Sequence, residues 1–384
     1  MLHHRLNKED NGTNMKKKEK KSLGNRQITG RIVSIAAALF LLVFVWRSIF
    51  SDFEKIQPIT GFDLYLEKED ICTIAFLGDE VWAGGVDGLF VLRKSNQTSS
   101  TLAGADISYE TEEIGDFSQV KAVLAAEDGI WAGHEEGLSF ISGDKILDWG
   151  TEDGLPDKRV NALEYDSQGI LWVGTWGGVA FLDDREIIGS LRAKDGLIDD
   201  MINAIFKAVN GDMWLGSYVA PRGGISIVNQ FEIQNISLEN GLLHSNINAI
   251  IELKDKMVLT GGGLFTKGGG TVFQYKGNKW SKVGELTKKD GIAGEKIRAL
   301  FLDSTDRIWV GSEYDGVAII EDFSINTSGK IEYSDILTIT QDNGLPNNEV
   351  KVIAESKDGN IWVGTRAGLL KIEKGGIENV RNPG

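Results

Sequence analysis

A motif built around tryptophan and glycine recurs along this chain at nearly even intervals. The clearest copy is Leu171–Thr175, which reads Leu-Trp-Val-Gly-Thr. Two further clear copies and four weaker ones, one of them without tryptophan, centre on Trp82, Trp131, Trp214, Val258, Trp309 and Trp362. The copies are spaced by about 41–53 residues, close to the period of about 40–50 residues expected of propeller repeats, in which each repeat forms one small sheet.

Each copy can be placed in a four-stranded sheet from its local pattern. An apolar segment such as Val160–Tyr165 precedes the motif across a short polar turn, here Asp166–Gly169, which indicates two antiparallel strands. The tryptophan strand is apolar on both faces, as expected of a sheet sandwiched between two others, and its glycine lets backbones approach near the axis. A third strand opens with Gly-Leu or Gly-Val, and a fourth, such as Ile146–Trp149, completes the sheet. The sequence therefore predicts an all-β, seven-bladed β-propeller over residues 62–384.

Two segments are candidates for the strand that closes the ring. Phe62–Asp70 precedes the first inner strand in the way that Leu147–Asp153 precedes the third, so we expect it to supply the outer strand of the last blade. Ile377–Val380, near the other end of the chain, is the alternative. The first choice would join both ends of the propeller within one sheet.

A second recurring element, Asp/Asn-Gly-Leu, precedes the inner strands, and its fullest form is Asn343–Asn348 (NGLPNN). With the tryptophan strands, this order of elements resembles the two-component regulator propeller family, whose repeat runs Gly-Leu-Pro-x-Asn, inner strand, Asp-x-x-Gly, Leu-Trp-Val-Gly-Thr and Gly-Gly-Leu. The resemblance implies an extracytoplasmic sensing domain, usually part of a larger histidine kinase or hybrid regulator. Because the sequence given ends at the seventh blade, we expect a signalling partner in trans.

The N-terminal region predicts how the propeller is held. Residues 31–50 contain an almost unbroken apolar run from Ile32 to Trp46, and at about 1.5 Å per residue the segment can cross a membrane if Arg31 and Arg47 reach the interfaces. The preceding tail, residues 1–30, is rich in lysine and is cytoplasmic by the positive-inside rule. We therefore predict a single-pass protein of the cell membrane, with residues 51–61 as a tether and the propeller outside.

A cleaved signal peptide is the alternative, since it too has basic residues before an apolar core. However, no small-x-small cleavage site follows Trp46, where the chain continues with Arg47–Phe53. No lipoprotein cysteine is present either, because Cys72 lies inside the first blade. The prediction is thus an uncleaved anchor, with Met15 as an alternative start of the chain.

Composition narrows the classes of function. The formal net charge is −15 at pH 7 although the tail is basic, so the propeller is acidic and nucleic acid is not an expected partner. Cys72 is the only cysteine, which excludes an intrachain disulfide and cysteine-type metal clusters, and we expect it in the core. No other spacing typical of a metal site stands out, so no cofactor is predicted.

The propeller topology gathers certain loops at one mouth of the central channel, namely those between second and third strands and those leading into each inner strand. There the frame repeats while the side chains vary, as in a ligand site on a rigid scaffold. We therefore predict binding of a small polar ligand, a sugar or a peptide, or of an envelope protein. The candidate binding residues are His134, Trp176, Tyr218, Arg222, His244, Glu313, Tyr314 and Arg366. The strand tryptophans are instead expected in the core.

Three functions fit these observations. The first is a ligand-binding sensory module, and the second is a scaffold for envelope proteins, because propeller rims bind proteins as readily as small molecules. The third is a lyase similar to the streptogramin lyases, a related propeller family that uses histidine, lysine and glutamate near the axis. Only His134 and His244 lie outside the tail as candidates for such a role. We favour the sensory module and predict no enzymatic activity.

Overall fold

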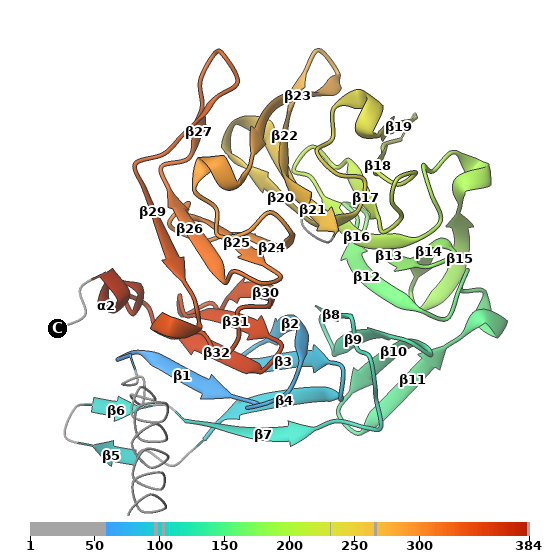
Figure 1. Ribbon diagram of the computed structural model, residues 1–384. Helices are drawn as coiled ribbons and strands as arrows, with labels where there is room; N and C mark the ends of the chain where they lie inside the picture. Colours follow the sequence, from blue (N-terminus) through green and yellow to red (C-terminus); the bar gives the residue numbers. More distant parts are fainter. Residues whose placement is uncertain are drawn as a thin grey trace, which may run out of the picture. The chain divides into compact units, whose positions relative to one another are not determined.

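The computed structural model describes residues 59–95, 99–101, 104–106, 108–230, 232–264 and 267–381. Within them, the strands form seven four-stranded antiparallel sheets arranged as propeller blades around a common axis (Figure 1). The predicted seven-bladed fold is therefore confirmed. The predicted tail, anchor and first part of the tether, residues 1–58, lie outside the described residues. In the part that is described, no helix is both long and apolar enough to span a membrane.

In each blade the strands run outward from the axis, and we number the blades in the chain order of their inner strands. The innermost strands are β2 (Ile71–Leu77), β8 (Ala122–Ala125), β12 (Val160–Tyr165), β16 (Ile202–Lys207), β20 (Ile247–Leu253), β24 (Ile297–Leu302) and β30 (Val350–Glu355). The second strands, which carry the recurring motif, are β3 (Glu80–Gly85), β9 (Ile130–His134), β13 (Leu171–Thr175), β17 (Met213–Ser217), β21 (Met257–Leu264), β25 (Ile308–Ser312) and β31 (Ile361–Thr365).

The outer half of each blade varies more in length than the inner half. The third strands are β4 (Leu89–Lys94), β10 (Gly137–Ser142), β14 (Gly178–Asp183), β18 (Ile225–Val228), β22 (Lys267–Lys276), β26 (Val317–Glu321) and β32 (Gly368–Ile372). The outermost strands are β7 (Tyr109–Glu113), β11 (Lys145–Trp149), β15 (Glu186–Leu191), β19 (Ile233–Ile236), β23 (Lys279–Leu286), β29 (Asp335–Ile339) and β1 (Phe62–Tyr65). Two small hairpins extend blades 1 and 6, namely β5 (Ser99–Thr101) with β6 (Gly104–Asp106) and β27 (Ser324–Ile325) with β28 (Ile331–Glu332).

The first strand of the propeller closes the ring. β1 pairs antiparallel with β32, with Phe62 opposite Ile372 and Tyr65 opposite Leu369. In Figure 1 the blue β1 therefore lies beside the red β32. The predicted closing role of the segment that begins at Phe62 is confirmed. The alternative segment instead forms the short helix α2 (Ile377–Arg381), and its first residue is buried against the last blade.

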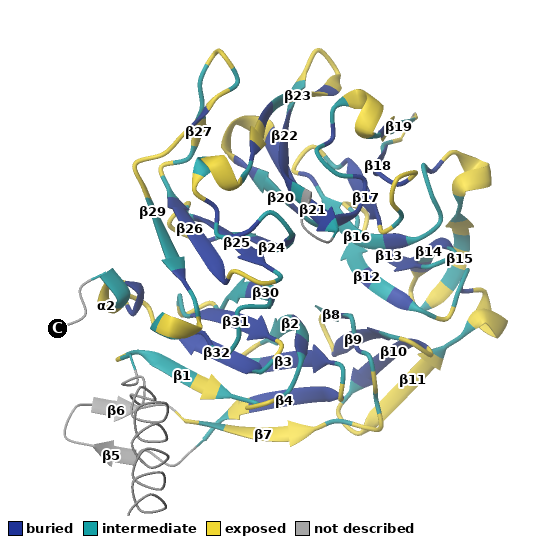
Figure 2. Cartoon of the chain, in the orientation of Figure 1, coloured by how far each residue is buried: buried dark blue, intermediate teal, exposed yellow. Residues whose placement is uncertain are grey.

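The tryptophan strands form the core between blades. β13, β25 and β31 are buried at every residue, whereas outer strands such as β7 and β11 are largely exposed (Figure 2). Trp309 is fully buried, and its Nε1 donates a hydrogen bond to Asp303 Oδ2 at 2.9 Å. Arg307 Nε donates to the same oxygen at 2.7 Å. The turn aspartate that the sequence identifies as a turn former therefore also anchors the core tryptophan.

The strand glycine has the steric role that its sequence position predicts. A Cβ atom at Gly311 would come within 2.7 Å of Val350 Cγ1 in the next blade and 3.1 Å of Ala299 Cβ in its own. Only a residue without a side chain fits there without displacing the inner strands.

Short 3₁₀ turns explain the Asp/Asn-Gly-Leu element before the inner strands of blades 3 to 7. In the first of them, Asp153 Oδ2 accepts a hydrogen bond from Gly150 N at 2.8 Å. Gly154 then adopts φ 113°, a conformation that favours glycine, and Leu155 is buried between blades. The turns are η1 (Thr151–Asp153), η2 (Ala193–Asp195), η3 (Leu238–Asn240), η5 (Lys288–Asp290) and η6 (Gln341–Asn343).

Blade 5 has valine at the motif position, and its buried tryptophan lies on a different strand of the same blade. Trp280 on the outer strand β23 is buried and lies 4.8 Å, ring centre to ring centre, from Trp214 of blade 4. Its Nε1 donates to Asp212 Oδ2 at 2.8 Å. The turn aspartate of blade 4 is therefore satisfied by a tryptophan of the neighbouring blade.

Candidate functional site at the mouth of the channel

A β-bulge recurs at one place in six of the seven inner strands and frees one side chain from each of these sheets, whereas in blade 2 the equivalent residue directly precedes β8. In β12, for example, the register with β13 slips between Val160 and Ala162. The same slip occurs in β2, β16, β20, β24 and β30. A bulge leaves the extra residue unpaired and re-aims its side chain. The residues at this position in the seven blades are Cys72, Lys121, Asn161, Asn203, Asn248, Arg298 and Lys351.

All seven side chains line one pocket of about 310 Å³, together with Trp176 and Tyr218 from two of the loops above. We call this nine-residue site the mouth pocket. Its volume is near the lower end of the range for small-ligand sites, about 300–1,000 Å³. Sequence reasoning missed its seven inner-strand residues. Their signal was a polar residue between two apolar ones in nearly every inner strand, as in Ile202–Ala204.

Blades 3 to 5 contribute amides to the mouth pocket. Asn161 Nδ2 donates to the backbone oxygen of Ile202 in the next blade at 3.0 Å. Asn203 and Asn248 make the equivalent bonds at 2.9 and 2.8 Å. These bonds tie neighbouring blades together and use the amide nitrogens. The amide oxygens are therefore the groups that this side of the pocket can offer as acceptors.

Blades 6 and 7 contribute cations that are fixed by carboxylates around the pocket. Lys351 Nζ lies 2.5 and 2.8 Å from the two oxygens of Asp70. Arg298 Nε lies 3.1 Å from Glu313 Oε2, and its Nη2 lies 3.5 Å from Glu349 Oε1. Both cations are largely buried, so these contacts hold them at the pocket wall.

Glu313 pairs with two cations of blade 6, Lys296 and Arg298. Burial by itself would raise its pKa, but hydrogen bonds from Lys296 and Tyr314 and the charge of Arg298 outweigh burial and lower the pKa. Lys296 Nζ also lies 5.9 Å from the centre of the Tyr314 ring. The carboxylate is therefore ionised at neutral pH and keeps the two cations of blade 6 in place.

Cys72 corrects one expectation, because it is not a core residue. The bulge in β2 turns it out of the sheet, and it is half-buried in the wall of the mouth pocket. Burial raises the pKa of its thiol, although Lys121 and Lys351 act in the opposite direction. Lys121 Nζ lies 4.0 Å from Cys72 Sγ, and no carboxylate in the described part of the chain lies within 4.0 Å of this ammonium group.

Of the residues predicted to bind ligand, the structure places Trp176 and Tyr218 in the mouth pocket. The guanidinium carbon of Arg159 lies 4.1 Å from the centre of the Trp176 ring, so one face of the ring is covered. Tyr218 is 38% exposed. These two rings supply the aromatic surface of the site.

Three further predicted residues lie in the loops around the pocket without lining it. Tyr314 is exposed beside Glu313, and Arg366 reaches Glu349 Oε2 at 3.8 Å from an exposed position. Arg222 is exposed in the loop between β17 and β18. The ion network thus brings Glu313 and Arg366 to one side of the pocket, whereas no contact within the described part of the chain links Arg222 to the site.

The two histidines are not brought together in the mouth pocket. His134 Nε2 lies 3.0 Å from Ser139 Oγ, and this hydroxyl donates to Asp148 Oδ1 at 2.5 Å. The imidazole is therefore part of a series of hydrogen bonds that leads to the outer strand of blade 2. His244 Nδ1 accepts a hydrogen bond from Asn246 N at 3.0 Å. Burial lowers the pKa of both imidazoles. Among the described residues, no three His, Cys, Asp or Glu side chains gather as a metal site requires.

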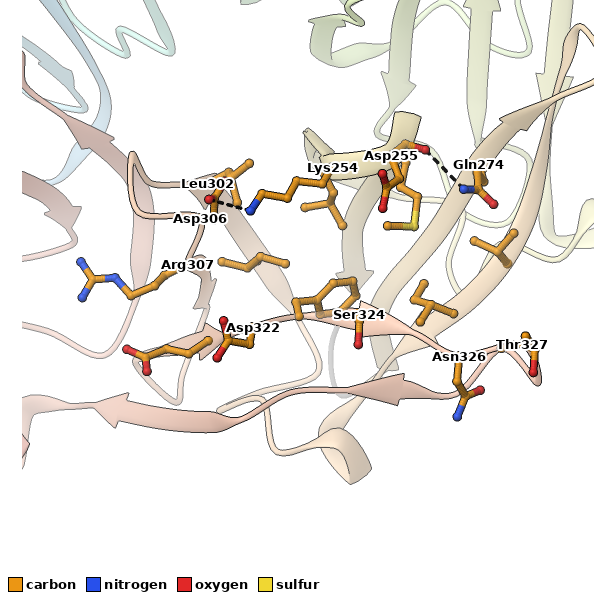
Figure 3. A pocket seen from close by; sticks show the side chains of 18 of the residues that line it. Lys254, Asp255, Gln274, Leu302, Asp306, Arg307, Asp322, Ser324, Asn326 and Thr327 are labelled. Atoms are coloured by element: carbon orange, nitrogen blue, oxygen red, sulfur yellow. Dashed lines mark hydrogen bonds and ion pairs between the residues drawn. The ribbon is translucent and has the colours of Figure 1, made fainter.

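A larger groove of about 1040 Å³ lies at the opposite end of blades 5 and 6, under the hairpin β27–β28 (Figure 3). Its polar side chains are engaged locally. Lys254 Nζ pairs with Asp306 Oδ2 at 2.7 Å, and Gln274 Nε2 donates to the backbone oxygen of Asp255 at 3.3 Å. Because only two blades and their turns form this groove, we take the mouth pocket, to which every blade contributes, as the candidate site.

Comparisons with known proteins agree with this architecture. Residues 154–177 and 344–367 match the family model described as two component regulator propeller. A search of curated proteins found no significant match. Among solved structures, the chain is similar to the extracellular domain of a putative one component system from B. thetaiotaomicron, with a TM-score of 0.59, 18% sequence identity and coverage of 82% of this chain and 40% of that one.

Solved propellers of other kinds share the fold. A catalytically inactive virginiamycin B lyase from Staphylococcus aureus with quinupristin matches with a TM-score of 0.57, 12% identity and coverage of 81% of this chain and 98% of that one. The WD40 β-propeller domain of Doa1 matches with a TM-score of 0.56, 12% identity and coverage of 83% and 99%. At these identities the likeness establishes the fold alone, and this chain spans only 40% of the extracellular domain that it matches. The chain is a seven-bladed β-propeller, and two of its repeats match the two component regulator propeller model.

Proposed function

We propose that this protein is a ligand-binding sensory module that recognises a small polar ligand in the mouth pocket. The observation that carries the proposal is the pocket itself, where one side chain from each of the seven blades meets Trp176 and Tyr218. Aromatic faces suit the apolar side of a sugar or peptide, and fixed amides and cations suit its polar groups. The similarity to an extracellular sensor domain supports the same function.

We further propose that residues 31–50 anchor the protein in the cell membrane. In this arrangement the N-terminal tail is cytoplasmic, the propeller is extracytoplasmic, and a separate partner carries the signal onward. The support is the apolar run in the sequence and the lysines before it. Protease treatment of spheroplasts should digest the propeller while a short membrane-bound fragment remains. A soluble mature chain that begins near Ser51 would contradict the anchor.

The test of the site is a double variant, Trp176→Ala with Tyr218→Ala, in a screen of sugars and peptides followed by calorimetry. Loss of the two aromatic faces should weaken binding at least tenfold, because such rings often dominate recognition, typically by about 1.4 kcal/mol or more. Tyr333→Ala is a matched control, since Tyr333 is also 38% exposed but does not line the mouth pocket. Unchanged affinity in the double variant would reject the site.

Two alternatives make different predictions with the same proteins. An envelope scaffold that uses the groove under β27–β28 would lose its partner in Ile325→Asp and keep it in the aromatic double variant. The lyase alternative is disfavoured because neither His134 nor His244 lines the mouth pocket in the described part of the chain. The shared fold with a virginiamycin B lyase alone does not supply a catalytic histidine.

A further inference from the structure

The two sides of the mouth pocket differ in chemistry, and the difference specifies a class of ligand. We propose that the mouth pocket binds a hydroxylated carboxylate the size of a sugar acid, such as a uronic acid. The carboxylate lies toward Lys121, Arg298 and Lys351, and the hydroxylated ring lies toward the asparagines and aromatic rings. This proposal rests on the proposed function and names the ligand class for that same site.

The nine described residues that line the mouth pocket include three cations, Lys121, Arg298 and Lys351, and no carboxylate. On this side of the pocket four cations share three carboxylates, and the pairs are Lys296–Glu313, Arg298–Glu313, Arg298–Glu349, Lys351–Asp70, Lys351–Glu349 and Arg366–Glu349. Lys121 adds a fifth cation with no described carboxylate in ion-pair range. Such an excess occurs in a chain whose net charge is −15. An anionic group of the ligand is the partner that this side lacks.

The opposite side of the pocket is suited to hydroxyl groups. Asn161, Asn203 and Asn248 donate through their amide nitrogens to the next blade, and Asn203 Nδ2 also donates to Asn248 Oδ1 at 3.2 Å. The oxygens of Asn161 and Asn203 and the second lone pair of Asn248 Oδ1 therefore remain as acceptors. Hydroxyl groups of a ligand can donate to these oxygens. Trp176 and Tyr218 come from the loops of blades 3 and 4, on this same side, and give the C–H face of a sugar ring an apolar surface.

The first test is calorimetry on the purified full-length chain with galacturonate, galactose and triglycine. We expect galacturonate to bind at least tenfold more tightly than galactose, because only the acid meets the cations. Triglycine carries a carboxylate but also an ammonium group and lacks hydroxyls, so it should bind more weakly than galacturonate. Tighter binding of triglycine would overturn the sugar acid in favour of a peptide terminus, and equal binding of galactose would overturn the carboxylate.

Lys121→Gln is the informative variant, because removing this ammonium leaves no described carboxylate unpaired. Its affinity for galacturonate should fall roughly tenfold, as for the loss of one charge-assisted hydrogen bond. Lys254→Gln is the control, since Lys254 is an exposed lysine on the opposite end of the propeller. Equal effects of the two substitutions would overturn the role of Lys121.

Cys72 provides a second readout that needs no ligand. It is the only cysteine of the chain and lines the pocket beside Lys121, so alkylating reagents report the local potential. We expect the rate ratio of anionic iodoacetate to neutral iodoacetamide to be higher in the folded chain than in urea. The ratio is independent of how much thiolate is present, and it should fall in Lys121→Gln.

The outcomes separate this inference from the proposed function. A rate ratio no higher than in urea, or the absence of galacturonate binding, would overturn the sugar acid and leave binding of a neutral ligand open. If the Trp176→Ala, Tyr218→Ala double variant keeps its affinity for galacturonate while Lys121→Gln loses it, the aromatic site fails and the anion site stands. The complete proposal predicts that the aromatic double variant and Lys121→Gln both lose affinity for galacturonate, and that galactose binds weakly to every one of these proteins.

Discussion

The tryptophan strands and the loops that follow them differ in structure although they are adjacent in the sequence. Trp172 is 8% exposed, packs against Phe181 and donates to Asp166 Oδ2 at 3.1 Å. Trp176, four residues later, lines the mouth pocket with Arg159 over one face of its ring. The strand is enclosed by two neighbouring blades, whereas Trp176 in the loop is held by a hydrogen bond from its backbone nitrogen to Arg159 O at 3.2 Å and by the Arg159 side chain over one face of its ring. Stability and recognition are therefore assigned to different residues of the same repeat.

The largest effect is expected from removing a tryptophan of the core strand. Trp172→Ala removes a large buried side chain and should lower the free energy of unfolding by about 3–5 kcal/mol. Trp176→Ala removes a ring that is open to the pocket and should cost far less. Urea unfolding of both variants measures the difference. Similar losses in the two proteins would mean that the loop tryptophan is as much a core residue as the strand tryptophan.

The next largest effect is expected at the turn aspartate Asp303, whose contribution to the free energy of unfolding depends on pH. Burial alone would raise the pKa of Asp303, but hydrogen bonds from Trp309, Thr305 and Arg307 outweigh it and lower the pKa. Its stabilising contribution is thus complete above the aspartate pKa of the unfolded chain, about 3.9, and is lost as the pH falls through the lower pKa of the folded protein.

Asp303→Asn should accordingly lower the free energy of unfolding at pH 7 by roughly 1.5–3 kcal/mol. The gap between wild type and variant should narrow as the pH falls below about 4. Unfolding curves at a series of pH values measure this gap. A constant gap across the acid range would argue against an ionised Asp303 in the core.

The strand glycine tests whether the blades are sterically crowded near the axis. Gly311→Ala places a methyl group against Val350 and should cost about 1–2 kcal/mol through overpacking. Gly189→Ala on the outer strand β15 is the matched control, because its nearest atom to the new Cβ, Phe181 Cδ2, is 3.7 Å away. Thermal unfolding should separate the two variants. A larger loss at Gly189 would contradict crowding of the blades near the axis.

The smallest effect is expected at the histidines of the rim. Neither imidazole lines the mouth pocket, so His134→Gln and His244→Gln should each leave ligand affinity within about twofold of wild type, as for sites without shared contacts. Calorimetry with the ligand of the mouth pocket provides the measurement. A tenfold change of ligand affinity in either variant would show that the binding site includes residues outside the mouth pocket, and would favour the lyase alternative.

The sequence by itself determined the propeller. An apolar inner strand, a polar turn and an apolar tryptophan strand are local features, and their repetition specifies seven sheets that must bury both faces against each other. It also singled out Trp176 and Tyr218, because the loops of a repeat can be located once its strands are known. The closing strand was the favoured of two choices, and Phe62 opposite Ile372 settles it.

Only the tertiary structure decided what those loops surround. The polar residue that recurs in the inner strands can be read from the sequence, but a bulge depends on pairing between strands, so the sequence does not show that Cys72, Asn203 and Lys351 leave the sheet. The mouth pocket needs one residue from each of seven blades, and its ion pairs join positions as distant as Asp70 and Lys351. Local pattern records which face of a strand is buried, whereas a site on the axis exists only after the ring has closed. For that reason the aromatic rim could be predicted and the cations beneath it could not.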